Sequence, residues 1–504
     1  MSEKRTRILT LAMNNFEDLI QRRRTKIVCT VGPSSSSDQM LRKLIRAGMD
    51  CARLNFSHGS HNEHLEVIRG IRRISDSLGK RIAIIQDLPG PKFRIGKLKN
   101  DVVRLRKGSI VTLATDKEAS DSETSIPLRQ QDLPKYVKKG TTIFLSDGTI
   151  RLRAIKTTEN EIVCKVLVGG DLFSGKGVNI PSLGEDFETF TEADRVHVLF
   201  GLEHRVDFIA ISFVRNETDV QTAKEFIRRH ATNPDSTPWI IAKIEKKRAL
   251  QNLAGIIGAS DAVMVARGDL GVENPIEEVP IIQKKIIATC NAKSIPVITA
   301  TQMLESMVLN ATPTRAEVTD VANAILDGTD AVMLSEETAV GKYPQECVRV
   351  LHRVSLNAED SMRRRKEIFP SFEFKPTGID DVSSFGAIRL SQDVGASLFI
   401  APTENGLVAS RLARFKPKAP ILAITSKETT ERKLKLVWGV SSLLVESKEG
   451  KGTYRLDRLL ETSIRELVRN KVVAAGEKLV VFCDSIEFFG QEGKLSFVTE
   501  AMDN

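Results

Sequence analysis

The chain contains eight short apolar runs, rich in β-branched residues, that alternate with amphipathic segments of helix length. Such alternation is typical of parallel βα units, in which a helix returns the chain to the same edge of the sheet after each strand. Eight strands are the number that closes a parallel barrel of the TIM type. The sequence therefore predicts an α/β fold with a (β/α)8 barrel. Its strands are expected in the runs Lys26–Val31, Cys51–Ser57, Ile82–Leu88, Phe208–Val214, Trp239–Glu245, Ala262–Asp269, Pro296–Thr301 and Ala331–Ser335.

The alternation breaks between the third and fourth runs. From about Lys92 to Glu188, strand-like runs joined by turns with Gly and Asp replace the helical segments, a pattern typical of a β meander. We expect a small β-barrel lid domain inserted in a loop of the barrel. Its strands are predicted at Ser109–Ala114, Thr141–Leu145, Ile150–Ile155 and Ile162–Val166.

A third region follows the eighth unit, after a basic cluster at 363–366 and a stretch containing Pro370 and Pro376 that predicts a linker. Beyond it, apolar runs again alternate with helical patterns, which predicts a smaller α/β domain. Its strands are expected at Leu398–Ala401, Ile421–Thr425, Ser441–Val445 and Lys478–Cys483. The predicted organisation is an N-terminal arm at 1–24, the barrel at 25–91 and 189–358, the insert at 92–188 and the C-terminal domain at 359–504.

The composition favours a globular protein of the cytoplasm. A length of 504 residues fits about three domains, and no apolar run approaches the roughly 18 residues of a membrane span. The net charge of +9 is spread along the chain, and its basic clusters lack the interleaved aromatic residues that stack on bases, so we expect no nucleic acid partner. Six widely spaced cysteines without a C-x-x-C pair favour a reducing setting. The first residues lack the apolar core of a secretory signal, although an organelle transit peptide stays open.

The strongest candidate for a site lies at the ends of the fifth and sixth runs. Side chains alternate along a strand, so Ile241, Lys243 and Glu245 share one face, and a lysine and a glutamate point inward together. The sixth run ends at Asp269, and neighbouring strands lie only about 4.8 Å apart. Glu245 and Asp269 can then share one hard cation, because two carboxylates with water or substrate oxygens are a usual way to hold Mg²⁺ in phosphoryl-transfer sites. The alternative is an ordinary buried ion pair between Lys243 and one carboxylate.

The second run also ends in polar residues. Arg53, Asn55 and Ser57 alternate onto one face, and an arginine at a strand end suits phosphate because its planar fork binds two oxygens at once. His58, which follows, is either an acid or base or a structural hydrogen-bonding residue of the turn.

Hydroxyl groups finish the seventh and eighth runs. Thr301 stands where a proton could be relayed to a carbanion-like carbon, and Ser335 and Thr338 follow the last predicted strand. Hydroxyls near strand ends also serve as helix N-caps. For Ser335 and Thr338 the sequence leaves both roles open.

Several of these segments, in this order, resemble the pyruvate kinase family. The resemblance extends along nearly the whole chain apart from the first two dozen residues. It rests on Arg-Leu-Asn-Phe-Ser-His-Gly at 53–59, Lys-Ile-Glu at 243–245, Ala-Arg-Gly-Asp-Leu-Gly-Val-Glu at 266–273, Ala-Thr-Gln-Met-Leu-Glu-Ser at 300–306 and Glu-Thr-Ala at 337–339.

The resemblance implies transfer of the phosphoryl group of phosphoenolpyruvate to ADP, giving ATP and an enolate that is protonated to pyruvate. It also implies a homotetramer and a C-terminal domain for regulation and assembly. The site residues that it implies fall into groups by role. The implied catalytic residues are Lys243, Arg53, Thr301, Ser335 and Arg94, and the implied substrate-binding residues are Arg53, Lys243, Gly268, Asp269, Thr301 and Ser212. Glu245 and Asp269 are the implied ligands of Mg²⁺ or Mn²⁺. The implied nucleotide-binding residues are Asn55, His58, Arg94 and Lys176, and the lid contributes Asp147.

One departure from the family pattern concerns the monovalent cation. In K⁺-dependent relatives, K⁺ is bound at positions matching Asn55, Ser57, Asp87 and the carbonyl of Leu88, and a Thr-Lys-Gly-Pro-Glu segment follows the aspartate. Here the segment is Leu-Pro-Gly-Pro-Lys at 88–92, so a lysine stands where those relatives have a carboxylate. We expect the ammonium of Lys92 to replace K⁺, which would then not be required.

A second departure concerns the effector. Sugar-phosphate-regulated relatives have a hydroxyl-rich loop after the first strand of the C-terminal domain, whereas this chain reads Thr-Glu-Asn-Gly-Leu-Val at 403–408. A phosphate would find fewer donors there, so regulation by fructose 1,6-bisphosphate is not expected. Four basic residues leave another anionic effector open: Arg411, Arg414, Lys416 and Lys418.

Other functions fit parts of the sequence. A metal-dependent aldolase or lyase of pyruvate-like acids could use the same barrel, carboxylates and arginine, because fold alone does not fix the reaction. The insert and the C-terminal domain speak against it, since a simple lyase needs neither. A binding protein on a decayed barrel is weaker, because none of the expected catalytic positions is lost.

Overall fold

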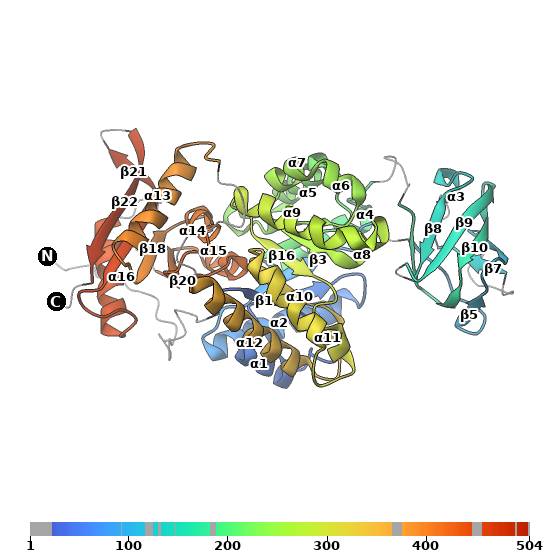
Figure 1. Cartoon of the computed structure of the whole chain (residues 1–504), viewed down its shortest axis with the longest axis horizontal. Coiled ribbons are helices and arrows are strands. Elements are labelled where there is room, and N and C mark those ends of the chain that lie inside the picture. The colour runs from blue at the N-terminus through green and yellow to red at the C-terminus, as the bar shows by residue number, and fades with distance from the viewer. Residues whose placement is uncertain are drawn as a thin grey trace.

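The structure is a computed structural model. It describes residues 23–91, 93–115, 124–129, 133–146, 148–181, 188–364, 375–445, 456–488 and 491–501. Three bodies lie in a row, with a barrel in the middle, the inserted domain at one end and the C-terminal domain at the other (Figure 1). Among the described helices, none is long and apolar enough to cross a membrane.

Eight parallel strands close the central barrel, so the predicted (β/α)8 fold is confirmed. Around the barrel the strands follow the order β1, β17, β16, β15, β14, β13, β3 and β2. Their bounds are β1 Lys26–Thr30, β2 Cys51–Asn55, β3 Ala83–Asp87, β13 Phe208–Ile211, β14 Trp239–Ile244, β15 Ala262–Ala266, β16 Val297–Ala300 and β17 Ala331–Leu334.

Helices surround the barrel and pack on the outward side chains of its strands. Several begin at a capping box, in which a Ser or Thr side chain and an acidic residue three positions later satisfy each other's backbone amides, as at Ser60 and Glu63. The helices are α1 Asp38–Ala47, α2 His61–Leu78, α4 Glu192–Glu203, α5 Glu217–His230, α6 Lys247–Gln251, α7 Leu253–Ala259, α8 Arg267–Glu273, α9 Val279–Ala292, α10 Arg315–Leu326, α11 Glu336–Ala339 and α12 Pro344–Arg363.

Alternation along the strands divides the barrel's apolar core into two layers. The outward side chains, such as Ile240 and Ala242, join the layer beneath the helices, whereas the inward ones fill the barrel. The inner layer includes Val28, Ile85, Phe208, Ile241, Met264, Ile298 and Met333. Because Ile241 belongs to this layer, the next inward position on β14 is Lys243, as the alternation predicts.

The insert leaves the barrel after β3 and returns before α4. Its described strands form a seven-stranded sheet in the order β4-β12-β8-β9-β10-β6-β7 and a two-stranded ribbon of β5 and β11 around one apolar core. All four predicted strands are present. The elements are β4 Phe93–Arg94, β5 Val102–Leu105, β6 Ile110–Ala114, β7 Ser125–Pro127, α3 Leu133–Tyr136, β8 Thr142–Leu145, β9 Ile150–Thr157, β10 Glu161–Val168, β11 Gly170–Phe173 and β12 Gly177–Asn179.

The C-terminal domain is a five-stranded sheet in the order β20-β19-β18-β21-β22. The first four strands are parallel and match the four predicted runs, but β22 pairs antiparallel with β21 and was not predicted. The elements are α13 Ile379–Asp393, β18 Leu398–Pro402, α14 Leu407–Ala413, β19 Ile421–Thr425, α15 Glu428–Lys433, β20 Val440–Leu444, α16 Leu456–Arg469, β21 Lys478–Phe488 and β22 Gln491–Glu500.

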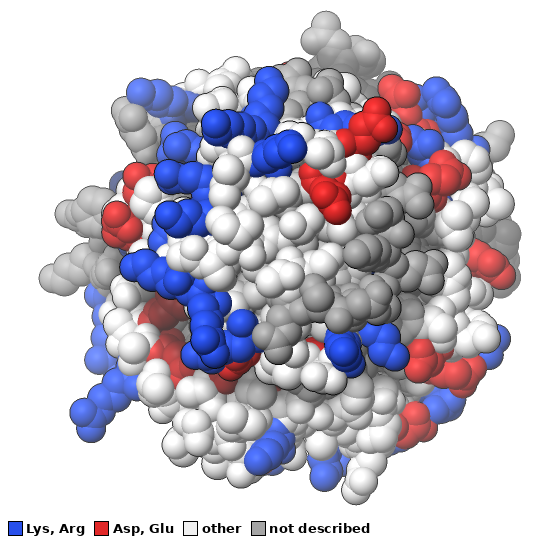
Figure 2. All heavy atoms as spheres, turned by 90° about the vertical axis from the view of Figure 1, so that its right-hand side faces the viewer, with Lys and Arg blue, Asp and Glu red and all other residues white. Residues whose placement is uncertain are grey.

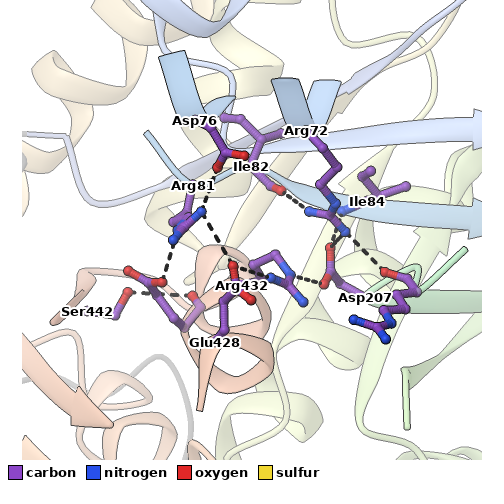
Figure 3. Close-up of polar contacts among 11 residues, drawn as sticks. Arg72, Asp76, Arg81, Ile82, Ile84, Asp207, Glu428, Arg432 and Ser442 are labelled. Carbon is purple, nitrogen blue, oxygen red and sulfur yellow. Dashed lines mark hydrogen bonds and ion pairs between the residues drawn. The ribbon is translucent and has the colours of Figure 1, made fainter. Parts of the chain in front are cut away.

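Buried charges attach the C-terminal domain to the barrel. Asp207, just before β13, accepts hydrogen bonds from Arg432 Nε of α15 at 2.6 Å and from Arg72 Nη2 of α2 at 2.8 Å (Figure 3). Asp330, just before β17, pairs with Lys416 at 2.9 Å, and Lys26 at the start of β1 donates to the Val440 carbonyl at 2.8 Å. Lys26, Asp207 and Asp330 all lie at the N-terminal ends of barrel strands. The C-terminal ends, where active sites of such barrels lie, face away from this interface.

Candidate active site at the C-terminal ends of the barrel strands

Lys243 is the centre of a buried polar cluster. Its Nζ lies 3.0 Å from Glu245 Oε1 and 3.1 Å from Asp87 Oδ1, and it donates to Ser212 Oγ at 2.8 Å. Burial opposes the charge of the lysine, but the two carboxylates outweigh this effect and raise its pKa. Lys243 is therefore a fixed positive charge at the C-terminal end of β14.

Asp87, at the end of β3, holds two cations in place. Its Oδ2 accepts from Arg53 Nε at 2.6 Å while Oδ1 faces Lys243. Burial favours the neutral acid, yet Lys243 and Arg53 hold the pKa of Asp87 below its usual range. Arg53 also donates to Thr30 Oγ1 at 3.0 Å, which fixes the guanidinium at the end of β2. The sequence placed Asp87 only among the monovalent-site positions and did not predict these two ion pairs.

Glu245 follows β14 directly and is oriented by two donors. The Phe213 backbone amide donates to Oε2 at 2.6 Å, while Lys243 lies against Oε1. Burial raises the pKa of Glu245, Lys243 opposes this shift, and the carboxylate of Asp269 adds to it. Asp269 thus lies close enough to act on Glu245 electrostatically. Lys243 and Glu245 form the buried ion pair that the sequence left open as the alternative to a metal site. The second carboxylate, that of Asp269, lies near this pair.

The strand predicted to reach Asp269 ends three residues earlier, at Ala266, so that part of the prediction is wrong. The chain turns into α8 at Arg267, which places Gly268 and Asp269 in the first turn of a helix. Gly268 is packed against the end of β16, since a Cβ atom there would lie 3.0 Å from Thr301 Cγ2. The close approach of the two segments explains why a glycine precedes Asp269.

The donor set suits a hard divalent cation. In the described part of the chain no group of three or more His, Cys, Asp and Glu side chains could hold a metal. Glu245 and Asp269 would supply two carboxylates, and water or substrate oxygens the remaining ligands, as is common for Mg²⁺. The carboxylate of Asp269 raises the pKa of Glu245, and a bound cation would relieve this repulsion.

Thr301 follows β16 in a left-handed conformation with φ of 74°, and Gln302 follows with φ of 56°. Such backbone is costly for residues other than glycine and is found where surrounding contacts enforce it. Arg267 supplies them: its Nη2 donates to the Thr301 carbonyl at 2.6 Å and its Nε to the Ala300 carbonyl at 3.1 Å. Arg267 was not predicted as a site residue, although it stands inside the quoted motif at 266–273.

The two other predicted hydroxyls differ in their contacts. Ser335 occupies the N-cap position of α11, but its side chain makes no capping hydrogen bond, and its amide donates to Glu337 Oε2 at 2.7 Å. Thr338 donates to the Thr30 carbonyl at 2.8 Å and is fully buried. Neither side chain is an N-cap, and the contact of Thr338 is structural.

The four positions matching the monovalent site lie together. Asn55 pairs in register with Asp87 across β2 and β3, and the Leu88 carbonyl accepts from Ser212 Oγ at 2.7 Å. The Ser57 amide donates to the Asn55 side chain at 3.2 Å, which fixes the turn after β2. Lys92 lies outside the described residues.

Arg94 and Lys176 are neighbours in the inserted domain, since Arg94 pairs in register with Gly177 and donates to the Gly175 carbonyl at 2.9 Å. Asp147 lies outside the described residues.

His58, in the turn after β2, is exposed, and its carbonyl oxygen lies 2.9 Å from His64 Nε2, within hydrogen-bond distance. At the end of the inserted domain that points away from the barrel, Lys and Arg gather along one side of the surface (Figure 2).

The inserted domain touches the barrel next to the site. Lys246, which follows Glu245, pairs with Glu273 of α8 at 2.6 Å and lies 3.4 Å from Asn179 Oδ1 of β12. A Cβ atom on Gly148 would lie 3.2 Å from Val272 Cγ2 of α8. The insert thus rests on the helix that carries Asp269.

The loop after β18 is filled by its own side chains. Glu404 Oε2 accepts from Ser426 Oγ at 2.8 Å, which puts a carboxylate between the two loops that follow β18 and β19. Of the four basic residues left open for an anionic effector, three form ion pairs: Arg411 with Asp380, Arg414 with Asp381 and Lys416 with Asp330.

The fold and the site together define a class of protein: a barrel enzyme with an inserted β domain, whose site sets a buried lysine and an arginine among carboxylates. Two family models match this chain, one for the pyruvate kinase barrel domain over residues 22–348 and one for the pyruvate kinase alpha/beta domain over residues 382–498. The chain belongs to the pyruvate kinase family.

Individual relatives agree with the family models. A pyruvate kinase of Thermotoga maritima is 46% identical over 424 residues, which cover 84% of this chain and 89% of that protein. A pyruvate kinase of Thermococcus litoralis is 45% identical over 422 residues, covering 83% and 88%. The crystal structure of a pyruvate kinase from Cryptosporidium parvum matches with a TM-score of 0.85 and 32% identity over 98% of this chain and 99% of that one. These comparisons support the kinase and not the aldolase or lyase alternative.

Proposed function

We propose that this chain transfers the phosphoryl group of phosphoenolpyruvate to ADP and protonates the resulting enolate, giving ATP and pyruvate. The observation that carries the proposal is the cluster of Lys243 with Glu245, Asp87 and Ser212 beside Arg53. Two fixed cations at a barrel's C-terminal edge suit a trianionic substrate. Two carboxylates next to them suit the divalent metal that the family requires.

Lys243 and Arg53 act as electrostatic catalysts. Lys243 stabilises negative charge on the moving phosphoryl group and on the enolate oxygen, and Arg53 orients the phosphate. Asp87 holds both cations, so little reorganisation is needed when the substrate arrives. Mg²⁺ or Mn²⁺ on Glu245 and Asp269 would serve as Lewis acid and template for the substrate oxygens. Ser212, which bonds Lys243, would complete the substrate contacts.

Protonation of the enolate falls to the residues at the ends of β16 and β17. Thr301, with Ser335 and water, forms the proton path to carbon, and the Gly268 and Asp269 amides hold the substrate carboxylate. The insert at 92–188 acts as a lid over the nucleotide, excluding water as lids commonly do. Asn55, His58, Arg94 and Lys176 would contact the nucleotide, and Asp147 would enter the closed site.

We expect pyruvate formation to require the metal and its carboxylates. With phosphoenolpyruvate and ADP, removal of divalent cations should abolish turnover, and Glu245→Gln should raise the Mg²⁺ concentration needed for half activity at least about tenfold, since one charged ligand is lost. A coupled assay of pyruvate formation measures both. Glu273→Gln, which changes a buried glutamate on the neighbouring helix, is the control, and an unchanged Mg²⁺ requirement in Glu245→Gln would contradict the assignment.

K⁺ is proposed to be dispensable, because Lys92 supplies a positive charge where K⁺-dependent relatives have a carboxylate. Turnover should be equal, within about twofold, in K⁺ and in tetramethylammonium buffer of the same ionic strength. Lys92→Glu should create a K⁺ requirement. A large loss of wild-type activity without K⁺ would refute the role of Lys92.

The protein is further proposed to be a cytoplasmic homotetramer. Ile276 and Ile281, before and within α9, are 72% and 67% exposed in the single chain, as expected for residues that another subunit covers.

Glu404 at the loop after β18 supports the expectation that fructose 1,6-bisphosphate is not an effector, because a carboxylate repels phosphate.

A further inference from the structure

Five of the chain's seven histidines occur in the two segments 58–64 and 197–204, which pack against each other. At the centre, His61 Nε2 and His197 Nδ1 share a hydrogen bond of 2.8 Å. Phe200 stacks on His61 with ring centroids 4.5 Å apart, and Phe56 meets His197 edge-on at 5.2 Å. The pair is thus a polar contact enclosed by aromatic rings.

The pair connects two segments with separate roles. His61 is the first residue of α2 and follows the turn after Asn55 that carries His58. His197 lies on α4, whose first turn contacts the segment that leads into the inserted domain: Asp194 Oδ1 accepts from the Gly90 amide at 3.1 Å, while Asp194 Oδ2 accepts from the Thr191 amide at 2.9 Å in the capping box of the helix itself. The His61–His197 hydrogen bond therefore ties the start of α2, next to the turn after β2, to the helix that holds the entrance of the inserted domain.

The contact depends on the protonation of the rings. A bond between two imidazoles needs one nitrogen that donates and one that accepts; a shift of tautomer preserves it while one ring is neutral, so it is lost when both rings are protonated. The titratable neighbours are His58 in the turn, Glu63 and His64 on α2, and Asp194 and His204 on α4; Gln86 of β3, which donates to the His197 carbonyl, is neutral. Burial lowers the pKa of His197, with His61 adding to the shift and Asp194 opposing it.

We propose that His61 and His197 are positioning residues for the nucleotide: their hydrogen bond fixes the turn after β2 against the base of the inserted domain at neutral pH and releases it on acidification. The inference rests on the proposed nucleotide contacts of Asn55 and His58. It adds a pH-dependent link between these contacts and the inserted domain.

The sign of the pH effect follows from the direction of the pKa shift. The folded protein binds a proton at His197 less readily than the unfolded chain does. The contribution of the pair to stability is therefore fully present above the ordinary histidine pKa of about 6.5 and is lost as the pH falls through the lower folded value. Binding that depends on the pair should weaken over the same range.

The test uses the full chain with His61→Phe, His197→Phe and the double variant, since phenylalanine keeps the aromatic packing and removes the hydrogen bond. Near pH 7.5 each single change should raise KM for ADP about fivefold, as the loss of one hydrogen bond predicts. The double variant should be no worse than either single one, and kcat should stay within about twofold. As the pH falls below about 6.5, the ratio of variant to wild-type KM should decline toward one, because the wild type loses the bond itself.

Two further measurements make the result decisive. His230→Phe, on α5 with its ring against Phe226, is the matched control and should leave the pH profile unchanged. The effects of the two single changes on the urea midpoint should be non-additive near pH 7.5 and should become additive as the pH falls below about 6.5. Additive effects at both pH values, or a KM ratio independent of pH, would overturn the proposal. If the wild type forms no pyruvate, the proposed function fails, whereas the unfolding cycle still decides whether the pair is a pH-sensitive contact.

Discussion

Lys243→Met should lower kcat for pyruvate formation at least about a thousandfold while the protein stays folded. The lysine lies 3.1 Å from Asp87 and 3.0 Å from Glu245, and methionine keeps its length but not its charge. Loss of one preorganised charge aimed at a transferring phosphoryl group costs about 10³ or more in kcat. Steady-state kinetics with phosphoenolpyruvate and ADP, together with circular dichroism of the variant, measure the effect.

The control for this result is Lys224→Met. Lys224 is also paired with an aspartate, Asp261, at 2.7 Å, but it lies on α5 and is 37% exposed. This change should leave kcat within about twofold, because exposed ion pairs contribute little. Turnover of Lys243→Met within tenfold of the wild type would refute the assigned role of the lysine.

Asp207→Asn should destabilise the attachment of the C-terminal domain by about 3 kcal/mol, with little change in kcat below the unfolding range. The carboxylate of Asp207 is 2% exposed and binds Arg432, Arg72 and the Ile84 amide (Figure 3). An asparagine removes the buried counter-charge that Arg72 and Arg432 share, although Arg432 keeps the half-exposed Glu428 at 3.1 Å. Breaking one partner of a buried pair costs about 3–5 kcal/mol.

Intrinsic fluorescence in a urea titration measures this loss, because both tryptophans of the chain lie at the same interface. Trp438 is 4% exposed beside Lys416 and Arg24, and Trp239 lies below Lys433 of α15. Asp76→Asn is the matched control: Asp76 pairs with Arg81 in the same network but is 60% exposed, so its loss should cost less than about 1 kcal/mol. Equal urea midpoints for Asp207→Asn and the wild type would show that the network does not hold the domains together.

Much of the site follows from strand periodicity alone. Inward alternation placed Lys243 on the interior face together with Ile241, and Ile241 belongs to the inner layer of the barrel. The same counting placed Arg53 on one face with Asn55, and Arg53 pairs with Asp87 of the neighbouring strand. A strand's face depends only on counting residues, so the sequence suffices for it.

The position of Asp269 shows where such counting fails. The sequence predicts a strand over 262–269, yet the strand ends at Ala266 and a helix begins. What ends the strand is the packing of Gly268 against Thr301 and the bonds of Arg267 to the carbonyls at 300 and 301. Those contacts join segments more than 30 residues apart, so no local pattern contains them.

The sequence by itself determined the eight-stranded barrel, the position of the insert, the C-terminal domain and the inward lysine, since each depends on local periodicity. Only the tertiary structure decided that Asp87 binds Arg53 and Lys243 together. Those residues come from three strands, β2, β3 and β14, and β13 stands between β3 and β14. Closure of the barrel turns their inward side chains toward one axis, where a buried lysine is stable only with carboxylates around it. The His61–His197 contact is likewise tertiary, because α2 and α4 are separated in the sequence by the whole insert and become neighbours through the adjacent strands β2, β3 and β13.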